Sequence, residues 1–207
     1  MAAGVLPFRP PCAGRTDTAQ RIVLVRHGET EWSRDGRHTG RSDVPLTEAG
    51  RAAAVRLRTP LAGWEFGAVF ASPMSRARET CELAGFGERA VVIDDLSEWD
   101  YGEYDGLTVE EVQRHRPGWL LWRDGPVGGE TLAAVASRAD RVIARARSAD
   151  GNALLFSHGH LLRVLAARWL EMAPAAGQRF FLATASPSVL GYEHEWTVIR
   201  RWNESTT

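Results

Sequence analysis

The sequence predicts an α/β fold, a three-layer α/β/α sandwich built on a mostly parallel central sheet. Two observations lead to this prediction. Short apolar runs alternate along the chain with longer segments of helical character, a pattern typical of parallel strands joined by right-handed crossovers. The first run, Ile22-Val23-Leu24-Val25, is apolar at every position, as expected for a strand that helices cover on both faces.

The remaining elements follow in chain order. Thr47 is expected to cap a helix that extends to about Arg58, with Glu48 in its first turn. Loops are expected over residues 31–45 and, with a polar and aromatic-rich sequence, over residues 94–106. The other expected helices are 75–84, 108–116, 131–147 and 161–170. The other expected strands are 68–71, 91–93, 153–156, 189–192 and 196–199, and the last two are expected to form a hairpin at one edge of the sheet.

Length and composition predict a single domain over residues 21–207. It is expected to follow a flexible extension, residues 1–20, which is rich in Pro, Gly and Ala and does not resemble a signal peptide. No apolar run approaches the roughly 20 residues that cross a bilayer, and the net charge of -1 gives no indication of a nucleic-acid partner. Two distant cysteines, Cys12 and Cys81, fit a reducing compartment, so we expect a cytoplasmic protein.

The basic residues are unusual because all 25 of them are arginine and none is lysine. This excludes a nucleotide-binding loop that ends in Gly-Lys-[Ser/Thr], and it excludes Schiff-base chemistry, since both need a lysine. Any phosphate site must therefore use arginine, histidine and backbone N–H groups. Arginine suits this role because its planar guanidinium can bind two phosphate oxygens at once.

Polar residues follow the carboxyl ends of four predicted strands. Arg26 and His27 follow the first strand, residues 72–76 the second, residues 94–101 the third, and His158 the fourth. Ligands bind at these strand ends in open α/β sheets, so we expect the four segments to form one site. Two arginines, Arg26 and Arg76, would repel each other there without an anion. A phosphate monoester carries about -1.5 to -2 charge and matches them.

His27 is the candidate nucleophile because a neutral imidazole can attack phosphorus, and an ordinary pKa of about 6.5 makes that form accessible. Gly28 is expected to let a ligand approach the backbone. The leaving group then needs a proton, and the first candidate for this general acid is Glu98, with Asp100 second.

Other interpretations of these residues remain open at this point. His27 and His158 are compatible with structural histidines, and His158 with His160 is compatible with a metal-ligand pair, although no H-E-x-x-H motif or cysteine pair accompanies it. No catalytic role is assigned to His38, His115 or His194. Three tryptophans are expected near the site: Trp32, Trp99 and Trp122. They are compatible with a sugar-binding wall and equally with packing residues.

Several motifs resemble those of one protein family. Residues 26–30, Arg-His-Gly-Glu-Thr, resemble the R-H-G-[EQ]-[ST] signature of the histidine phosphatase superfamily, in the branch that contains cofactor-dependent phosphoglycerate mutase. Further segments resemble family motifs in the same order: residues 72–80 (S-x-x-x-R-A-x-x-T), 96–102 (L-x-E-x-x-x-G), 129–131 (G-E-[ST]) and 157–159, which hold the second histidine. The resemblance extends from residue 21 to about residue 194.

The resemblance implies a phosphoglycerate mutase-like fold and a reaction that needs no metal or other cofactor. It implies that His27 becomes phosphorylated and that Glu98 first protonates the leaving oxygen and later activates water. The phosphoryl oxygens are assigned to Arg26, Arg76 and His158. Substrate contacts are assigned to Ser33, Thr39, Gly40, Tyr101, Gly159 and His160.

The superfamily contains both mutases and phosphatases, and two departures from the mutases favour hydrolysis. The stretch between residues 102 and 129 is short and lacks the lysine and paired arginines of mutases, and residues 157–161, Ser-His-Gly-His-Leu, replace their A-H-G-N-S segment. Residues 30–33, 39–40, 98–102 and 122–125 are similar to fungal sedoheptulose bisphosphatase and to bacterial mutase-like acid phosphatases. The expected substrate is therefore a small sugar phosphate or sugar bisphosphate.

Two alternatives to this phosphomonoesterase are a phosphoglycerate mutase-type phosphotransferase and a non-catalytic phosphate-binding interaction module. The complete set of His27, Arg26, Arg76, Glu98 and His158 argues against the second. The expected partner is a small phosphorylated metabolite, with neither nucleic acid nor membrane involved, and a homodimer is compatible with the sequence.

Overall fold

The computed structural model describes residues 19–205, and within them a six-stranded sheet has the order β3-β2-β4-β1-β5-β6. The strands are β1 (Ile22–Arg26), β2 (Phe66–Ala71), β3 (Ala90–Val92), β4 (Asn152–Ser157), β5 (Pro187–Glu193) and β6 (Trp196–Arg201). Strands β1 to β4 are parallel to their neighbours among them, whereas β5 is antiparallel to β1 and to β6. This confirms the mostly parallel sheet and the closing hairpin at one edge.

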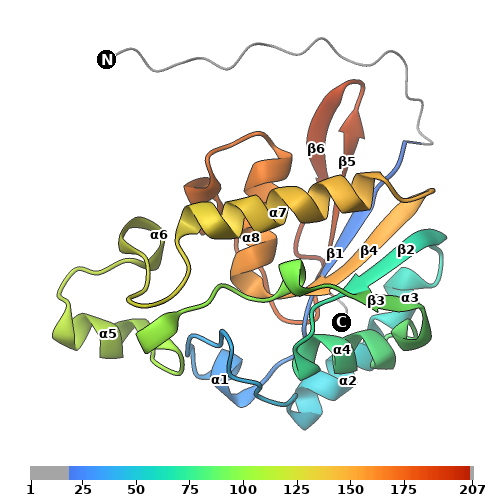
Figure 1. Ribbon diagram of the computed structural model, residues 1–207. Coiled ribbons are helices and arrows are strands. Elements are labelled where there is room, and N and C mark those ends of the chain that lie inside the picture. Colours follow the sequence, from blue (N-terminus) through green and yellow to red (C-terminus); the bar gives the residue numbers. More distant parts are fainter. Residues whose placement is uncertain (1–18, 206–207) are drawn as a thin grey trace, which may run out of the picture.

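Helices cover both faces of the sheet (Figure 1). They are α1 (Glu31–Arg34), α2 (Glu48–Arg56), α3 (Arg58–Leu61), α4 (Ser75–Leu83), α5 (Val109–His115), α6 (Leu121–Asp124), α7 (Leu132–Arg147) and α8 (Gly159–Trp169). Because side chains alternate along a strand, Ile22 and Leu24 of β1 pack in the core with α7 and α8. Val23 and Val25 pack on the other face with residues of α3 and α4. The three-layer sandwich is thereby confirmed.

The main differences from the predicted elements are short helices inside the predicted loops. A capping box between Thr30 and Ser33 starts α1 within residues 31–45, and 3₁₀ turns form at Asp94–Leu96 and Gly102–Tyr104 within residues 94–106. The helix predicted to Arg58 ends at Arg56, and α3 follows it. One-turn helices span too few residues to show helical periodicity, so the sequence pattern gives no signal for them.

The start of the described chain is attached to the domain. Gln20 Nε2 donates to the carbonyl oxygens of Ala146, Ala149 and Gly151 between α7 and β4. Residues 1–18 of the predicted extension, with Cys12, lie outside the described residues. Cys81 is buried in α4, and burial raises the pKa of its thiol to about 12. In residues 19–205, no helix is both long and apolar enough to cross a membrane.

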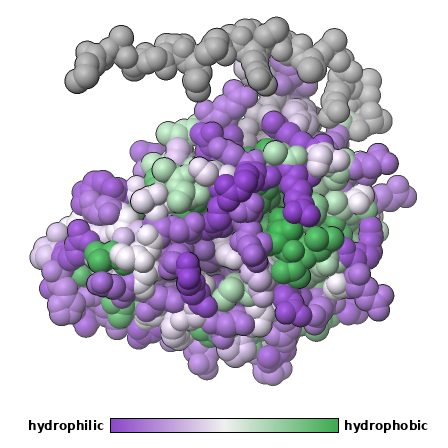
Figure 2. Space-filling view, viewed as in Figure 1, coloured by the Kyte–Doolittle hydropathy of each residue, from purple (hydrophilic) through white to green (hydrophobic). Residues whose placement is uncertain are grey.

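Figure 2 shows a largely hydrophilic face with an apolar area below α7, where β2 and β3 lie. Val91 and Val92 of the edge strand β3 are 48% and 47% exposed.

Candidate active site

The parallel register of the sheet brings the predicted site residues together. Arg26, the last residue of β1, lies opposite Ser157 of β4, and the backbone N–H of His27 donates to the carbonyl of Ser157 at 2.9 Å. His158 is therefore beside His27, with 5.2 Å between the ring centroids. Ser72, after β2, is aligned in the same way through its N–H, which donates to Phe156. The expected convergence at the strand ends is present.

The tautomer of His27 is fixed by its neighbour. Its Nδ1 lies 2.7 Å from the carbonyl oxygen of Gly28, and a carbonyl can only accept, so Nδ1 carries the proton. Nε2 is left with its lone pair. Burial, followed by the charges of Arg26 and Arg76, lowers the pKa of His27 well below its ordinary value. The ring is consequently neutral at neutral pH, which is the form that can attack phosphorus.

Two guanidinium groups flank this ring, those of the half-buried Arg26 and the buried Arg76, and backbone carbonyls accept hydrogen bonds from both. Arg26 Nη1 donates to the carbonyl of Leu182 at 2.6 Å. Arg76 is completely buried, and its Nη atoms donate to the carbonyls of Thr39, Gly40 and Ser42. Burial lowers the pKa of each arginine, but a guanidinium stays protonated in proteins, so both charges remain.

Three buried nitrogen atoms of this cluster have no hydrogen-bond partner among residues 19–205: Arg26 Nε, Arg76 Nε and His158 Nδ1. The Nε2 atom of His158 lies 2.7 Å from the hydroxyl of Ser72. No other acceptor for that hydroxyl proton occurs in the described chain, so we assign it to the hydrogen bond with Nε2. Nδ1 of His158 then carries the ring proton. Buried donors are almost always bonded, so three unbonded donors, two of which belong to guanidiniums, indicate an anion site.

Glu98 lies at the first turn of α8 and is only 8% exposed. Its Oε1 accepts from the backbone N–H groups of Trp99 and Leu161, both at 2.9 Å. Within residues 19–205, Oε2 accepts only from the backbone N–H of His160, at 3.0 Å. Oε2 is therefore the oxygen with room for a proton. Asp100 pairs with Arg41 at 2.8 Å and does not line the cavity that contains His27, whereas Glu98 does. Geometry therefore favours Glu98 as the acid.

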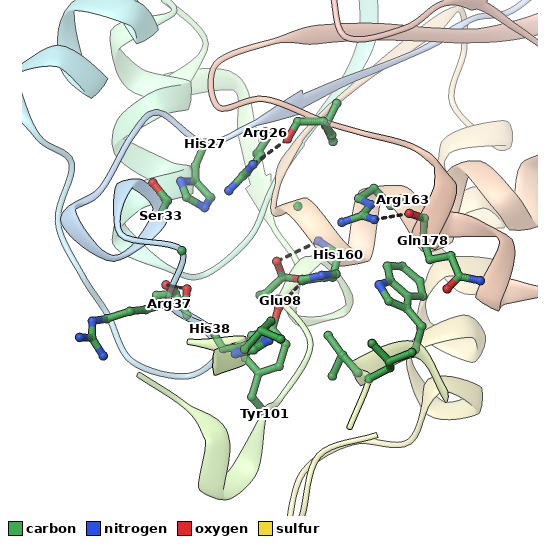
Figure 3. A pocket seen from close by; sticks show the side chains of 18 residues that line it. Arg26, His27, Ser33, Arg37, His38, Glu98, Tyr101, His160, Arg163 and Gln178 are labelled. Atoms are coloured by element: carbon green, nitrogen blue, oxygen red, sulfur yellow. Dashed lines mark hydrogen bonds between the residues drawn. The ribbon is translucent and has the colours of Figure 1, made fainter. Parts of the chain in front are cut away.

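A cavity of about 330 Å³ opens in front of His27, Arg26 and Glu98 (Figure 3). Arg76 and His158 lie behind its wall, buried next to His27. The predicted substrate residues that line the cavity are Ser33, Thr39, Tyr101, Gly159 and His160.

Gly40 does not line this cavity and supports Arg76 instead. Its carbonyl accepts from Arg76, its N–H donates to Asp105 at 2.7 Å, and a Cβ there would lie 2.9 Å from the carbonyl oxygen of Trp99. Gly28 also differs from expectation. A Cβ on Gly28 would lie 2.6 Å from the carbonyl oxygen of Gly50 in α2, so it allows close helix packing rather than ligand approach.

Several lining residues were not predicted from the sequence. They are Gly36, Arg37, His38, Val109, Leu120, Leu121, Arg163, Gln178 and Leu182. A signal existed for Arg163, since it is three residues after His160 and shares its helix face. Trp122 lines the cavity, Trp99 is fully buried in the core, and Trp32 packs on Gly106. Of the two roles expected for these tryptophans, Trp122 is part of the cavity wall, whereas Trp99 and Trp32 are packing residues.

The chain matches the model of the histidine phosphatase superfamily (branch 1) over residues 22–205. It is 41% identical over 183 residues to the acid phosphatase of Mycobacterium tuberculosis, covering 84% of this chain and 87% of that protein. It is 36% identical over 185 residues to the sedoheptulose 1,7-bisphosphatase of Saccharomyces cerevisiae, covering 73% and 68%.

A solved structure of the open reading frame Rv3214 of M. tuberculosis has a TM-score of 0.86 and 38% sequence identity, covering 91% of this chain and 99% of that one. The fold is accordingly of the phosphoglycerate mutase-like α/β type. A family match over nearly the whole described chain and relatives named as phosphatases lead to one conclusion: the chain belongs to the histidine phosphatase superfamily and is a phosphatase.

Proposed function

We propose that this phosphatase is a metal-independent phosphomonoesterase that transfers a phosphoryl group first to Nε2 of His27 and then to water. The observation that carries the proposal is the position of a neutral His27, with a free lone pair, beside three unpartnered buried donors. Positive charge for the phosphoryl oxygens comes from the guanidiniums of Arg26 and Arg76, and a further hydrogen bond comes from the N–H of the neutral His158.

In the first step the lone pair of His27 Nε2 forms a bond to phosphorus while the bond from phosphorus to the ester oxygen breaks. Protonated Glu98 gives its proton from Oε2 to that oxygen, which leaves as an alcohol. The proton of His27 stays on Nδ1 and keeps donating to the carbonyl oxygen of Gly28, which stabilises the positive charge that the ring acquires.

In the second step a water molecule attacks the phosphohistidine. The carboxylate of Glu98 accepts a proton from that water, the bond from phosphorus to Nε2 breaks, and inorganic phosphate leaves. Glu98 is then protonated and His27 neutral, so the enzyme is ready for another cycle. The protein contributes position and charge in both steps, which is the main requirement of phosphoryl transfer.

The substrate is a small phosphate monoester, for which a sugar phosphate is the model. The cavity of about 330 Å³ is at the lower end of the roughly 300–1,000 Å³ typical of small-molecule sites. A relative in yeast is named for a sugar bisphosphate. His38, His160 and Trp122 in the wall suit hydroxyl groups and the apolar face of a sugar ring.

The test replaces the nucleophile. His27→Ala is expected to lower turnover of p-nitrophenyl phosphate, assayed with EDTA, by about 10³-fold or more, because no other group supplies the attacking lone pair. Its thermal unfolding is expected to stay close to that of wild type, and His194→Ala, in the exposed turn between β5 and β6, is the matched control. Retention of more than a few per cent of turnover in His27→Ala, or loss of wild-type turnover in EDTA, contradicts the proposal.

A further inference from the structure

Arg163 supplies a second positive charge to the cavity, away from the nucleophile. It projects from α8 one turn after His160 and lines the same cavity. Figure 3 shows Arg163 and Gln178 on the side of Glu98 opposite to His27 and Ser33. The cavity therefore has two cationic ends. We call the end at His27 and Arg26 the phosphoryl end and the end at Arg163 and Gln178 the leaving-group end.

The Arg163 side chain is held in one orientation. Its Nε donates to the carbonyl of Gly177 at 3.0 Å and its Nη2 to the carbonyl of Gln178 at 2.9 Å. Its guanidinium carbon lies 4.9 Å from the ring centroid of Trp122, within cation–π range. A Cβ on Gly177 would lie only 2.7 Å from the carbonyl oxygen of Arg163, so a glycine is needed for this close packing against α8.

The charge of Arg163 is not neutralised by an ion pair within residues 19–205. Arg168, on the same helix, differs because it pairs with Asp140 at 2.9 Å. Glu98 attracts Arg163 only in its ionised form, and in that form it acts on Arg26 and Arg76 as well. A partly buried, immobilised and unpaired guanidinium is ready to bind an anion without the cost of ordering it.

We propose that Arg163 forms a second anion subsite, so that the preferred substrates are phosphate monoesters whose leaving group ends in a carboxylate or a second phosphate. This rests on the proposed function, which places the phosphoryl group at His27. The cavity wall also includes the apolar side chains of Leu120, Leu121 and Leu182, which can contact the connecting part of the leaving group without further charge.

The first experiment uses the wild-type enzyme and alkyl phosphates of one chain length that end in hydroxyl, carboxylate, phosphate or ammonium. A charge-assisted hydrogen bond is worth about 1.5–3 kcal/mol, so kcat/KM is expected to be about 10- to 100-fold higher for the two anionic ends than for hydroxyl. The ammonium end is expected to be poorest. Comparing carboxylate with phosphate shows which anion the subsite takes better.

The second experiment compares Arg163→Met with Arg168→Met. The ratio of kcat/KM for anionic to hydroxyl ends is expected to fall about 10-fold or more in Arg163→Met and to stay at the wild-type value in Arg168→Met. Arg163→Lys keeps the charge and is expected to keep part of the ratio. If Arg163→Met does not fold, the comparison of alkyl phosphates with the wild-type enzyme still tests whether an anionic end group is preferred.

The outcomes distinguish the two proposals. Hydrolysis of p-nitrophenyl phosphate with equal kcat/KM across the alkyl series, or an unchanged ratio in Arg163→Met, overturns the subsite alone. Absence of hydrolysis of p-nitrophenyl phosphate overturns the proposed function, and the subsite with it.

Discussion

His38 and His160 present opposite hydrogen-bonding characters to the cavity. His38 Nδ1 lies 2.7 Å from the carbonyl of Leu107 and must donate to it, so Nε2 is an acceptor. The Tyr101 hydroxyl lies 2.6 Å from His160 Nδ1 and has no other acceptor within residues 19–205, so it donates there and leaves the His160 proton on Nε2. Burial lowers the pKa of both histidines and raises that of Tyr101, so all three rings are neutral.

Tyr101→Phe removes the hydroxyl that donates to His160 Nδ1, so His160 is no longer expected to be held in a single tautomer. The buried Nδ1 would lose its donor, and the proton would then distribute between both ring nitrogens. We expect KM for a hydroxyl-bearing substrate to rise about 5- to 10-fold, equivalent to a lost hydrogen bond of about 1 kcal/mol, with a smaller change in kcat. Steady-state kinetics measure this split. Tyr192→Phe, where the ring packs on Trp169 away from the cavity, is the control, and equal KM values for the two variants would refute the assigned tautomer.

The junction between β4 and α8 is the element that assembles most of the site. Within a few residues it supplies His158, the N–H groups that bind Glu98, and the cavity face of His160 and Arg163. Free N–H groups at a helix N-terminus suit a carboxylate, which explains why Glu98 is held there. The helix begins at Gly159, two residues before the predicted start, because His158 is its extended N-cap.

Gly159 is expected to be required for activity because of its neighbour on β1. A Cβ at this position would lie 3.3 Å from Nε and 3.4 Å from Cζ of Arg26, so alanine would displace the guanidinium from the proposed phosphoryl site. We expect Gly159→Ala to lower kcat/KM about 10-fold with little change in melting temperature, since alanine favours the helix. Enzyme kinetics and thermal unfolding measure the two effects. Gly63→Ala, whose Cβ would meet nothing within 4 Å, is the matched control, and identical kcat/KM in both variants would contradict this role.

Across the whole domain, the features that the sequence predicts are those governed by periodicity and topology. The apolar strands and the right-handed crossovers predict the parallel sheet. The positions of Arg26, Arg76 and His158 at the carboxyl ends of strands predict that these residues lie near His27. The leaving-group wall was largely missed. It comes from α6, from Gln178 and from Leu182, which carry no repeating pattern and meet only through tertiary packing. The packing role of Gly28 could not be predicted from the sequence either, because its contact with Gly50 depends on how α2 packs against the residues that follow β1.

Buried neutral histidines give the whole fold a pH dependence of known sign. His27, His158 and His160 each have a pKa well below the ordinary value, with burial as the largest cause. Above about pH 6.5 these rings are neutral in both the folded and the unfolded chain. Below it the unfolded chain binds protons that the folded chain does not, so the free energy of unfolding must fall as the pH falls.

We therefore expect the free energy of unfolding in urea to decrease between pH 6.5 and pH 5.5 by about 1 kcal/mol per ring. Between pH 7.5 and pH 6.5 the decrease is expected to be about a third as large, because the protonated fraction of an unfolded histidine rises there only from roughly a tenth to a half. His160→Gln removes one of the three rings and should reduce the slope, whereas His194→Gln, at an exposed turn, should leave it as in wild type. A free energy of unfolding that stays constant down to pH 5.5 would mean that these rings are protonated in the folded state, and that His27 is not the neutral nucleophile inferred from its burial.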